Sequence, residues 1–475
     1  MKTLLKLVGF CTALIAQLIF AEEPALPLGL KAAAPQEPAL PLGISAPASP
    51  EPSLPAGLDT PADSPQLAPP SERTLPKGLS GFWELRGGSR LQNDPYEKTA
   101  SLGETRLQLQ LDKASERIAL KVGGDFLYDP VLNEHRLDLE DGDGWFDLRQ
   151  ANLLLRPASF VDLKLGRQIN TWGTGDMLFI NDLFSKDWNS YFIGRDDEYL
   201  KAPSDSAKAS FFSEWANLDL IYSPRFDSDR YIDGHRLSYW NANQGRLAGR
   251  NATVYADKPD DSFRDDEWSA RLYRTIGSYE IAAYGYDGFW KSPAGSDPES
   301  GQAIFPRLQV FGSSARGPFA SGILSLETGW YRSADDLDGN DPFVRNSEMR
   351  YLIGYEQELA RNLTGGLQYY VEQMMDYDAY QRMLPTGLSP ADEYRQVVTL
   401  RLTKLLMSQN LQLGTFIYFS PTDLDAYLRP KASYKIDDHW IVERGGNLFF
   451  GEDDQTFFGQ FERNNNLYAS LRYGF

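Results

Sequence analysis

Cysteine is almost absent from this sequence of 475 residues, since the single cysteine, Cys11, lies in an apolar stretch near the N-terminus. A disulfide framework, thiol catalysis and a cysteine-ligated metal are therefore excluded for the rest of the chain. Histidine is scarce as well: His135, His235 and His439 are the only three, and none stands in a recognisable Ser–His or Asp–His motif. No glycine-rich phosphate loop follows a predicted strand. We therefore predict that the protein is not an enzyme and uses no metal or cofactor.

Long apolar runs are also missing. After residue 21, no segment approaches the roughly 20 apolar residues of a transmembrane helix, and the mean hydropathy is −0.43. Hydropathy alone would describe a water-soluble chain. However, a strand that exposes only alternate residues to lipid also averages to a polar value, so this deficit does not exclude a membrane protein built from strands.

Basic residues are in deficit, with 47 Lys and Arg against 66 Asp and Glu and a formal net charge of −19. This charge argues against a nucleic-acid partner. The densest acidic runs, residues 137–143 and 335–341, are predicted to lie in loops. Asp336, Asp338 and Asn340 have the spacing of calcium ligands, but the expected glycine and final glutamate are missing. Solvated loop charge is the favoured interpretation, and calcium binding is the alternative.

The first 79 residues differ in composition from the rest. Lys2 and Lys6 precede an apolar run that ends at Ala21, which predicts a signal peptide over residues 1–21. Residues 22–79 carry a Leu-Pro-x-Gly-Leu repeat at a step of 14 residues. Because proline at this density prevents both helices and strand ladders, we predict a disordered periplasmic tail. The tail is either a passive spacer or a binding segment for a periplasmic partner.

Residues 80–475 alternate between apolar and polar side chains, as Leu107, Leu109 and Leu111 do with Arg106 and Gln108. Alternate side chains of a strand face opposite sides. The alternating segments run for about 9–13 residues, which is the length that a tilted strand needs to cross a bilayer. We predict an all-β fold, a transmembrane antiparallel up-and-down barrel of about 18 strands. Sixteen strands remain an alternative, because residues 206–223 are weakly patterned and residues 456–463 could form an extra hairpin arm.

The connections between these segments alternate in length, and this alternation is the layout of an outer-membrane barrel. Short turns lie near residues 112–115, 157–159 and 276–278. Long loops are predicted at 129–143, 170–205, 224–264, 290–304, 335–346, 375–391 and 450–465. The high aromatic content, 13%, is consistent either with a β-rich core or with two aromatic belts at the membrane interfaces.

The last strand ends in Tyr473-Gly474-Phe475, and the segment Gly166–Gly173 contains Gly-Arg-Gln followed by Trp-Gly. In these residues the chain resembles bacterial outer-membrane porin-like barrels, and it is similar to barrels of the alginate-export type. The resemblance implies location in the cell outer membrane, among its lipid and lipopolysaccharide. It also implies that Tyr473 and Phe475 are read by the barrel-assembly machinery, and that the barrel is a channel.

With the apolar face toward lipid, the basic residues of the other face are candidates for lining a pore. They are Arg106, Lys121, Lys164, Arg167, Arg350, Arg395, Arg401, Arg429, Lys431, Lys435 and Arg472. Uncompensated cations favour anions in a pore, whereas charges that pair across strands only keep the interior wet. We expect a channel for passive diffusion of small hydrophilic solutes that prefers anions, with the loop opened by Trp172 folded inward. The alternative is a structural or adhesive barrel without a conducting pore.

Overall fold

The computed structural model describes residues 76–132, 137–139, 142, 144–384 and 390–475. The predicted signal peptide, nearly all of the predicted tail, and His135 lie outside these residues. The first strand begins at Leu79, close to the predicted boundary at residue 80.

Eighteen strands form one sheet, as predicted from the alternating segments. In chain order they are β1 (Leu79–Arg90), β2 (Ala100–Ala114), β3 (Ile118–Tyr128), β4 (Phe146–Ala158), β5 (Val161–Gln168), β6 (Ser204–Phe211), β7 (Asn217–Ser223), β11 (Glu267–Ile276), β12 (Tyr279–Phe289), β15 (Arg307–Phe319), β16 (Gly322–Ser333), β17 (Glu348–Ala360), β18 (Leu363–Met374), β19 (Tyr394–Leu406), β20 (Leu411–Ser420), β21 (Asp425–Lys435), β22 (Trp440–Phe450) and β23 (Asn466–Gly474).

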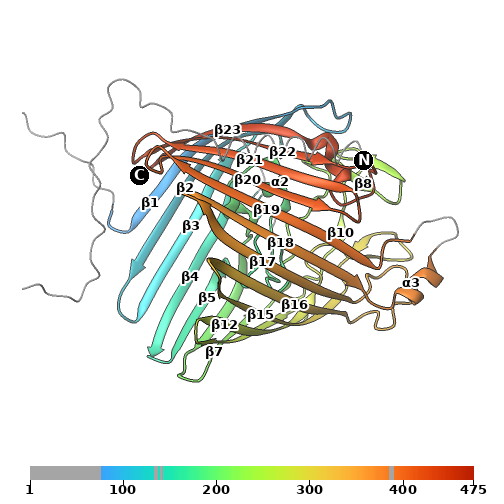
Figure 1. The fold of residues 1–475 in the computed structure, drawn as a ribbon, viewed down its shortest axis with the longest axis horizontal. Coiled ribbons are helices and arrows are strands. Elements are labelled where there is room, and N and C mark those ends of the chain that lie inside the picture. The colour runs from blue at the N-terminus through green and yellow to red at the C-terminus, as the bar shows by residue number, and fades with distance from the viewer. Residues whose placement is uncertain (1–75, 133–136, 140–141, 143, 385–389) are drawn as a thin grey trace, which may run out of the picture. The chain divides into compact units, whose positions relative to one another are not determined.

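Each strand pairs antiparallel with its neighbours in sequence, and β1 pairs with β23 to close the barrel (Figure 1). At the closing pair, Phe82 lies opposite Gly474. Beyond it, Gly81 and Phe475 exchange two backbone hydrogen bonds of 3.0 Å. The closed sheet leaves no unpaired edge strand, so every strand of the barrel satisfies its backbone groups on both sides.

Short turns gather at one end of the barrel and most of the long loops at the other, as predicted. The loops carry short elements of their own: β8 (Tyr239–Asn241), β9 (Arg246–Ala248), β10 (Ala256–Asp257), β13 (Gly295–Ser296), β14 (Ala303–Ile304), α3 (Tyr377–Met383) and the 3-10 helix η2 (Gly459–Asn464). The suggested hairpin arm at residues 456–463 is therefore wrong. The segment turns into η2 because the Phe461 ring packs 5.3 Å from Phe192 and 5.6 Å from Phe449, centroid to centroid.

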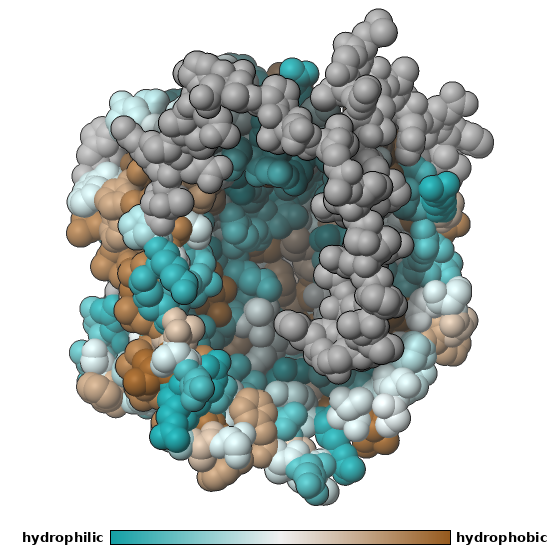
Figure 2. All heavy atoms as spheres, turned by 90° about the vertical axis from the view of Figure 1, so that its left-hand side faces the viewer, coloured by the Kyte–Doolittle hydropathy of each residue, from teal (hydrophilic) through white to brown (hydrophobic). Residues whose placement is uncertain are grey.

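The outer face of the barrel is apolar and the inner face is polar. On β18, Leu367 is 54% exposed on the outside, whereas its neighbour Gln368, on the inside, is 8% exposed. Figure 2 shows a hollow lined by hydrophilic side chains, with hydrophobic side chains on the outer flanks. Exposed aliphatic side chains of the strands include Leu85, Ile118, Leu120, Val122, Leu165, Leu220, Leu272, Ile281, Ile323, Leu326, Ile353 and Leu467.

Exposed aromatic side chains lie toward both ends of the strands. Those near the short turns include Phe160, Phe211, Trp215, Tyr279 and Phe319. Those nearer the long loops include Tyr128, Trp145, Trp268, Phe311, Trp330 and Tyr394. Two such belts are what a barrel exposes at the two water–membrane interfaces.

Residues 169–203, which connect β5 to β6, lie inside the barrel and are called the inner segment. They include the helix α2 (Trp188–Ile193) and the 3-10 helix η1 (Asp197–Leu200). Their side chains and backbone contact inward-facing residues of many strands, including Glu327 on β16, Gln368 on β18 and Tyr418 on β20. The expectation that the loop opened by Trp172 folds inward agrees with this placement.

Candidate functional site

One carboxylate of the wall fixes the first part of the inner segment. Glu327 accepts hydrogen bonds from the backbone nitrogens of Thr174 and Gly175 at 3.0 Å, and from the backbone and side-chain nitrogens of Asn181 at 2.9 Å. Glu327 is almost fully buried. A buried carboxylate needs such donors in place of water, so this turn and β16 hold each other in one arrangement.

The helix α2 is capped at both ends, which sets where the acidic residues after it emerge. The Asp187 side chain accepts from the Ser190 backbone nitrogen at 2.7 Å. At the other end, Gly194 adopts a φ of 93°, and a Cβ on this residue would lie 2.2 Å from the Tyr468 ring. Only glycine suits this backbone conformation and this close approach. The chain therefore leaves α2 toward β23 and presents Asp196 and Asp197 to the wall.

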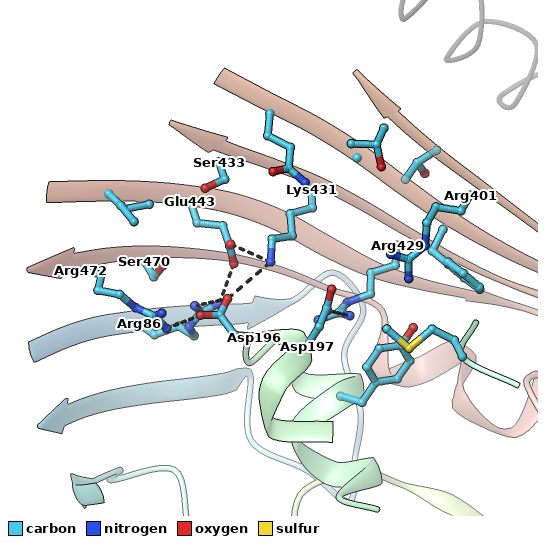
Figure 3. Close-up of a pocket in the computed structure, with 18 of the residues that line it drawn as sticks. Arg86, Asp196, Asp197, Arg401, Arg429, Lys431, Ser433, Glu443, Ser470 and Arg472 are labelled. Atoms are coloured by element: carbon cyan, nitrogen blue, oxygen red, sulfur yellow. Dashed lines mark hydrogen bonds and ion pairs between the residues drawn. The ribbon is translucent and has the colours of Figure 1, made fainter. Parts of the chain in front are cut away.

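Asp196 and Asp197 contact a row of cations on the wall formed by β19–β23 and β1 (Figure 3). Asp196 pairs with Arg86 at 3.2 Å, with Lys431 at 3.4 Å and, more closely, with Arg472. Asp197 pairs with Arg429. These cations favour the ionised carboxylates, so the pKa of Asp196 and that of Asp197 lie below their usual range despite burial.

Between this wall and the inner segment lies a cavity of about 290 Å³, here called the charged cavity. Its lining contains five basic side chains, Arg86, Arg401, Arg429, Lys431 and Arg472, and four acidic side chains, Glu84, Asp196, Asp197 and Glu443. Lys431 bonds Glu443 at 2.9 Å, and Arg472 bonds Glu84 at 2.9 Å. The charges are therefore largely paired, with basic residues in excess by one.

Arg401 lies where the charged cavity meets a second, polar cavity that is lined by Trp172, Gly173 and Thr174. Its Nε pairs with Asp176 of the inner segment at 2.5 Å. Burial raises the pKa of the Asp176 carboxyl group, Arg401 opposes the shift and Glu356 adds to it. Asp176 therefore takes up a proton more readily than Asp196 or Asp197, whose carboxylates also pair with this wall.

The inner segment is also anchored to β2 and β4, which follow β1 in the sheet and lie across the barrel from the anchor at Glu327 on β16. Arg195 donates to Glu104 of β2 at 2.5 and 2.9 Å. The Tyr199 ring of η1 lies under two guanidinium groups, with its centroid 4.1 Å from Arg106 and 4.9 Å from Arg149. With Glu327 on β16 at one side and Glu104 on β2 at the other, the inner segment is a fixed strap across the lumen.

Nine of the eleven predicted pore-lining cations form ion pairs with carboxylates. Besides those of the charged cavity, Arg106 pairs with Glu104 at 2.7 Å and with Asp125. The remaining pairs are Arg167 with Asp205, Arg350 with Glu348 and Glu372, Arg395 with Asp423, and Lys435 with Asp438. Arg401, Arg429, Lys431 and Arg472 line the charged cavity together, and the other predicted cations do not join them there.

Several predicted residues lie apart from this group. Lys121 faces Asp112 across β2 and β3, and Lys164 faces Lys208 across β5 and β6. Arg167, three residues after Lys164, donates to the carbonyl oxygens of Leu148 and Leu139. Lys435 ends β21 at the short turns, and Arg395 lies closer to the long loops. Arg395, Arg401 and Lys435 are therefore spread along the length of β19 and β21, with Arg395 and Lys435 toward opposite ends of the barrel.

Tyr473 and Phe475 lie at the closing pair. The Tyr473 ring packs 4.9 Å from Trp440 and 6.3 Å from Phe475, centroid to centroid. Both residues continue the alternation of outward-facing side chains along β23, as the sequence pattern predicts.

The acids of the inner segment were missed by sequence reasoning, which placed the acidic excess in outer loops. Asp196-Asp197-Glu198 is a visible acidic run inside a loop that was expected to fold inward, and this combination was the available signal. Arg86 was missed as well, although it shares the alternation of β1 with Glu84.

Two further predictions from the sequence concern calcium binding and histidine chemistry. The Asp336 carboxylate accepts the backbone nitrogens of Asn340 and Asp341, so its own loop uses the oxygens that the calcium interpretation needs. His235 does contact a carboxylate, with 2.6 Å between its Nδ1 and Asp233, two residues earlier. Within the described ranges, no cluster of three or more metal-binding side chains occurs. No helix in the described part of the chain is long and apolar enough to span a bilayer.

A closed antiparallel barrel with an apolar outer face, a polar lumen and an inward-folded loop is a porin-type transmembrane β-barrel. No family model matches the chain, and no curated protein matches its sequence.

Solved structures do resemble it. OccK11 (OpdR) of Pseudomonas aeruginosa is 13% identical, with a TM-score of 0.48 over 83% of this chain and 95% of that one. OccAB1 of Acinetobacter baumannii is 10% identical, with a TM-score of 0.49 over 84% and 96%. OmpF of Salmonella typhi, solved in complex with daunomycin, is 10% identical, with a TM-score of 0.41 over 84% and 97%. Because these identities and TM-scores are low, the assignment to porin-type transmembrane barrels rests on the fold of this chain itself.

Proposed function

We propose that the protein is an outer-membrane channel for passive diffusion of small hydrophilic solutes, with a modest preference for anions. The observation that carries this proposal is the charged cavity between the inner segment and the wall of β19–β23 and β1. It is a polar space of about 290 Å³ inside a barrel whose outer face is apolar. The signal peptide predicted from the sequence and the terminal Tyr-x-Phe support the location in the outer membrane.

The anion preference is modest because every cation of the charged cavity has a carboxylate partner, although the partner of Arg401, Asp176, lies outside the cavity lining. The lining of the charged cavity has one basic side chain more than it has acidic ones, and this excess sets the sign of the ion preference. In a narrow lumen a fixed charge is screened less than on an open surface, so a small excess acts on passing ions. Arginine also offers two donors to a carboxylate or phosphate group, which favours such solutes over chloride.

The test is the reversal potential of the reconstituted full-length protein in a potassium chloride gradient across a planar bilayer. The double variant Arg401→Ala with Arg429→Ala leaves three basic against four acidic side chains in the charged cavity, so its preference should turn toward cations. Lys435→Ala is the control, because this lysine pairs with the exposed Asp438 at the short turns. A cation-selective wild type, or an unchanged double variant, would contradict the anion preference. Absence of any conductance would favour the alternative of a structural barrel.

A further inference from the structure

A smaller cavity of about 180 Å³ lies nearer the long loops than the charged cavity and differs from it in chemistry. It is called the aromatic cavity. From the inner segment it receives Phe179, Trp188 and Phe192, and from the loop before β23 it receives Phe457. The Trp188 ring centroid lies 6.1 Å from those of both Phe179 and Phe192. Ring faces and edges therefore form most of the walls.

Among the residues that the structure describes, two charged residues line the aromatic cavity, Arg350 and Arg395. Arg395 donates its Nε to Asp423 at 2.7 Å, and Arg350 donates Nε and Nη2 to Glu348 at 3.0 and 2.6 Å. Glu372 lies 3.5 Å from Arg350 Nε as well, and none of these three carboxylates lines the cavity. Both Nη atoms of Arg395 and Nη1 of Arg350 donate no hydrogen bond to any residue that the structure describes, so they remain available to a ligand.

The size and the lining select one kind of ligand. An apolar cavity of about 150 Å³ holds a benzene molecule, so the aromatic cavity has room for one ring. Ring faces and edges bind another flat ring with a gain beyond simple burial. Two guanidinium groups without a lining carboxylate repel cations and bind an anionic group. A solute rich in hydroxyl groups would lose more hydrogen bonds to water than these walls return.

The aromatic cavity is reachable from the long-loop side. It shares six lining residues with a larger cavity of about 500 Å³, which extends to Tyr231, Trp290 and Tyr331. A ring that enters among the loops would meet the aromatic cavity before the charged cavity, because Arg395 and Val397 precede Arg401 along β19.

We propose that the aromatic cavity is a binding site for a single aromatic ring that carries one carboxylate or sulfonate group. The ring lies among Trp188, Phe192 and Phe457, and the anionic group bonds Arg395 and Arg350. Binding is a property of the barrel itself, whereas its consequence for transport rests on the proposed channel function.

The binding test uses the full-length protein in detergent and isothermal titration calorimetry. Benzenesulfonate carries both features, methanesulfonate carries only the charge, and benzenesulfonamide carries only the ring. Benzenesulfonate should bind at least tenfold more tightly than either of the others. Arg395→Gln should remove that advantage over benzenesulfonamide, and Phe457→Ala should weaken benzenesulfonate about fivefold, which is the size of one aromatic contact.

Two loop variants serve as matched controls. Phe263 is 76% exposed and the Arg264 side chain is 81% exposed, and neither lines the aromatic cavity. Phe263→Ala and Arg264→Gln should leave benzenesulfonate binding unchanged. Equal binding of benzenesulfonate and methanesulfonate, no binding at all, or equal losses in the controls would overturn the proposal. If Arg395→Gln does not fold, Phe457→Ala alone decides between these outcomes.

A second measurement separates this proposal from the channel function. Benzenesulfonate added on the long-loop side should reduce the potassium chloride current of the reconstituted protein to a saturating level, and methanesulfonate should not. Calorimetric binding of benzenesulfonate without any potassium chloride current would contradict only the channel function. Potassium chloride current without calorimetric binding would contradict only the aromatic site.

Discussion

Asp196 and Arg86 are 110 residues apart in sequence, and an ion pair of 3.2 Å joins them inside the barrel. Arg86 belongs to β1, and the further partner Arg472 belongs to β23. One carboxylate of the inner segment therefore bonds both strands of the closing pair. The strap that narrows the lumen is fastened at the place where the barrel closes.

Asp196→Asn should loosen this strap. An amide cannot neutralise Arg86, Lys431 and Arg472, and removing one partner of a buried ion pair costs about 3–5 kcal/mol. We expect a less heat-stable barrel with larger and noisier single-channel conductance. Asp438→Asn is the control, since its carboxylate is exposed and pairs only with Lys435. Unchanged conductance and heat stability would show that the inner segment is held without Asp196.

Acidification should strengthen the anion preference, and Asp176 should be responsible. Its pKa is raised by burial, whereas the pKa values of Asp196 and Asp197 are lowered by their cations. As the pH falls, Asp176 therefore takes up a proton before Asp196 and Asp197 do and leaves the positive charge of Arg401 uncompensated. The measurement is the reversal potential at pH 7.5 and pH 5. Asp176→Asn should show the acidic value at both pH values, and a pH response in this variant equal to that of wild type would contradict the assignment.

Asp227, in the connection from β7 to β11, should make the barrel less stable at neutral than at acidic pH. Burial and the nearby Glu267 raise the pKa of Asp227 to about 6. The folded protein then binds a proton that the unfolded chain has already lost, so stability falls as the pH rises from the ordinary carboxyl range through about 6.

The variant Asp227→Asn is neutral at every pH and should lack this loss. Since one unit of pKa corresponds to about 1.4 kcal/mol, the variant should be more stable than wild type at pH 8 by on the order of 3 kcal/mol. At pH 4 the two should be alike. The temperature at which the folded band disappears in heat-modifiability gels reports this, with the exposed Asp454→Asn as control. A variant no more stable than wild type at pH 8 would refute the expectation.

Deletion of Phe475 should lower the yield of assembled barrel. Its backbone exchanges two hydrogen bonds with Gly81 at the closing pair, and it is the residue expected to be read during assembly. Fractionation should show less protein in the outer membrane and more in the periplasm. Deletion of an exposed residue in a long loop, such as Asp454, should not have this effect. Equal yields would remove the assembly role of Phe475.

The barrel could be predicted from sequence because alternation is a local property. Each strand reveals its outer face by its own residues, as Leu107 and Leu109 do beside Arg106, and sequential pairing follows from the short turns. The extra hairpin suggested at residues 456–463 failed because its pattern cannot show that Phe461 packs on the distant Phe192.

The site was harder to predict because its contacts join residues far apart in the chain. Alternation placed Arg401 and Arg429 on the inner face, and the closed sheet sets them on either side of Phe416. Nothing local shows that Arg395 would lie near the aromatic rings instead, six residues away along a strand that spans the barrel wall. The pairing of the cations with Asp196 and Asp197 depends on how the strap turns at Gly194, and the pairing of Arg401 with Asp176 depends on the turn that Glu327 and Gln368 hold.

The pairing of β1 with β23 makes barrel formation an all-or-nothing event for the chain. Every other strand meets its partner across one turn or one loop, so those pairings close shorter stretches of chain and cost less entropy. The closing pair joins the first strand of the barrel to the last strand. It therefore cannot form until all eighteen strands have been placed side by side. Until then, β1 and β23 are open edges on a largely apolar sheet, which is a template for aggregation. A chain truncated before β23 should therefore aggregate rather than form a leaky channel.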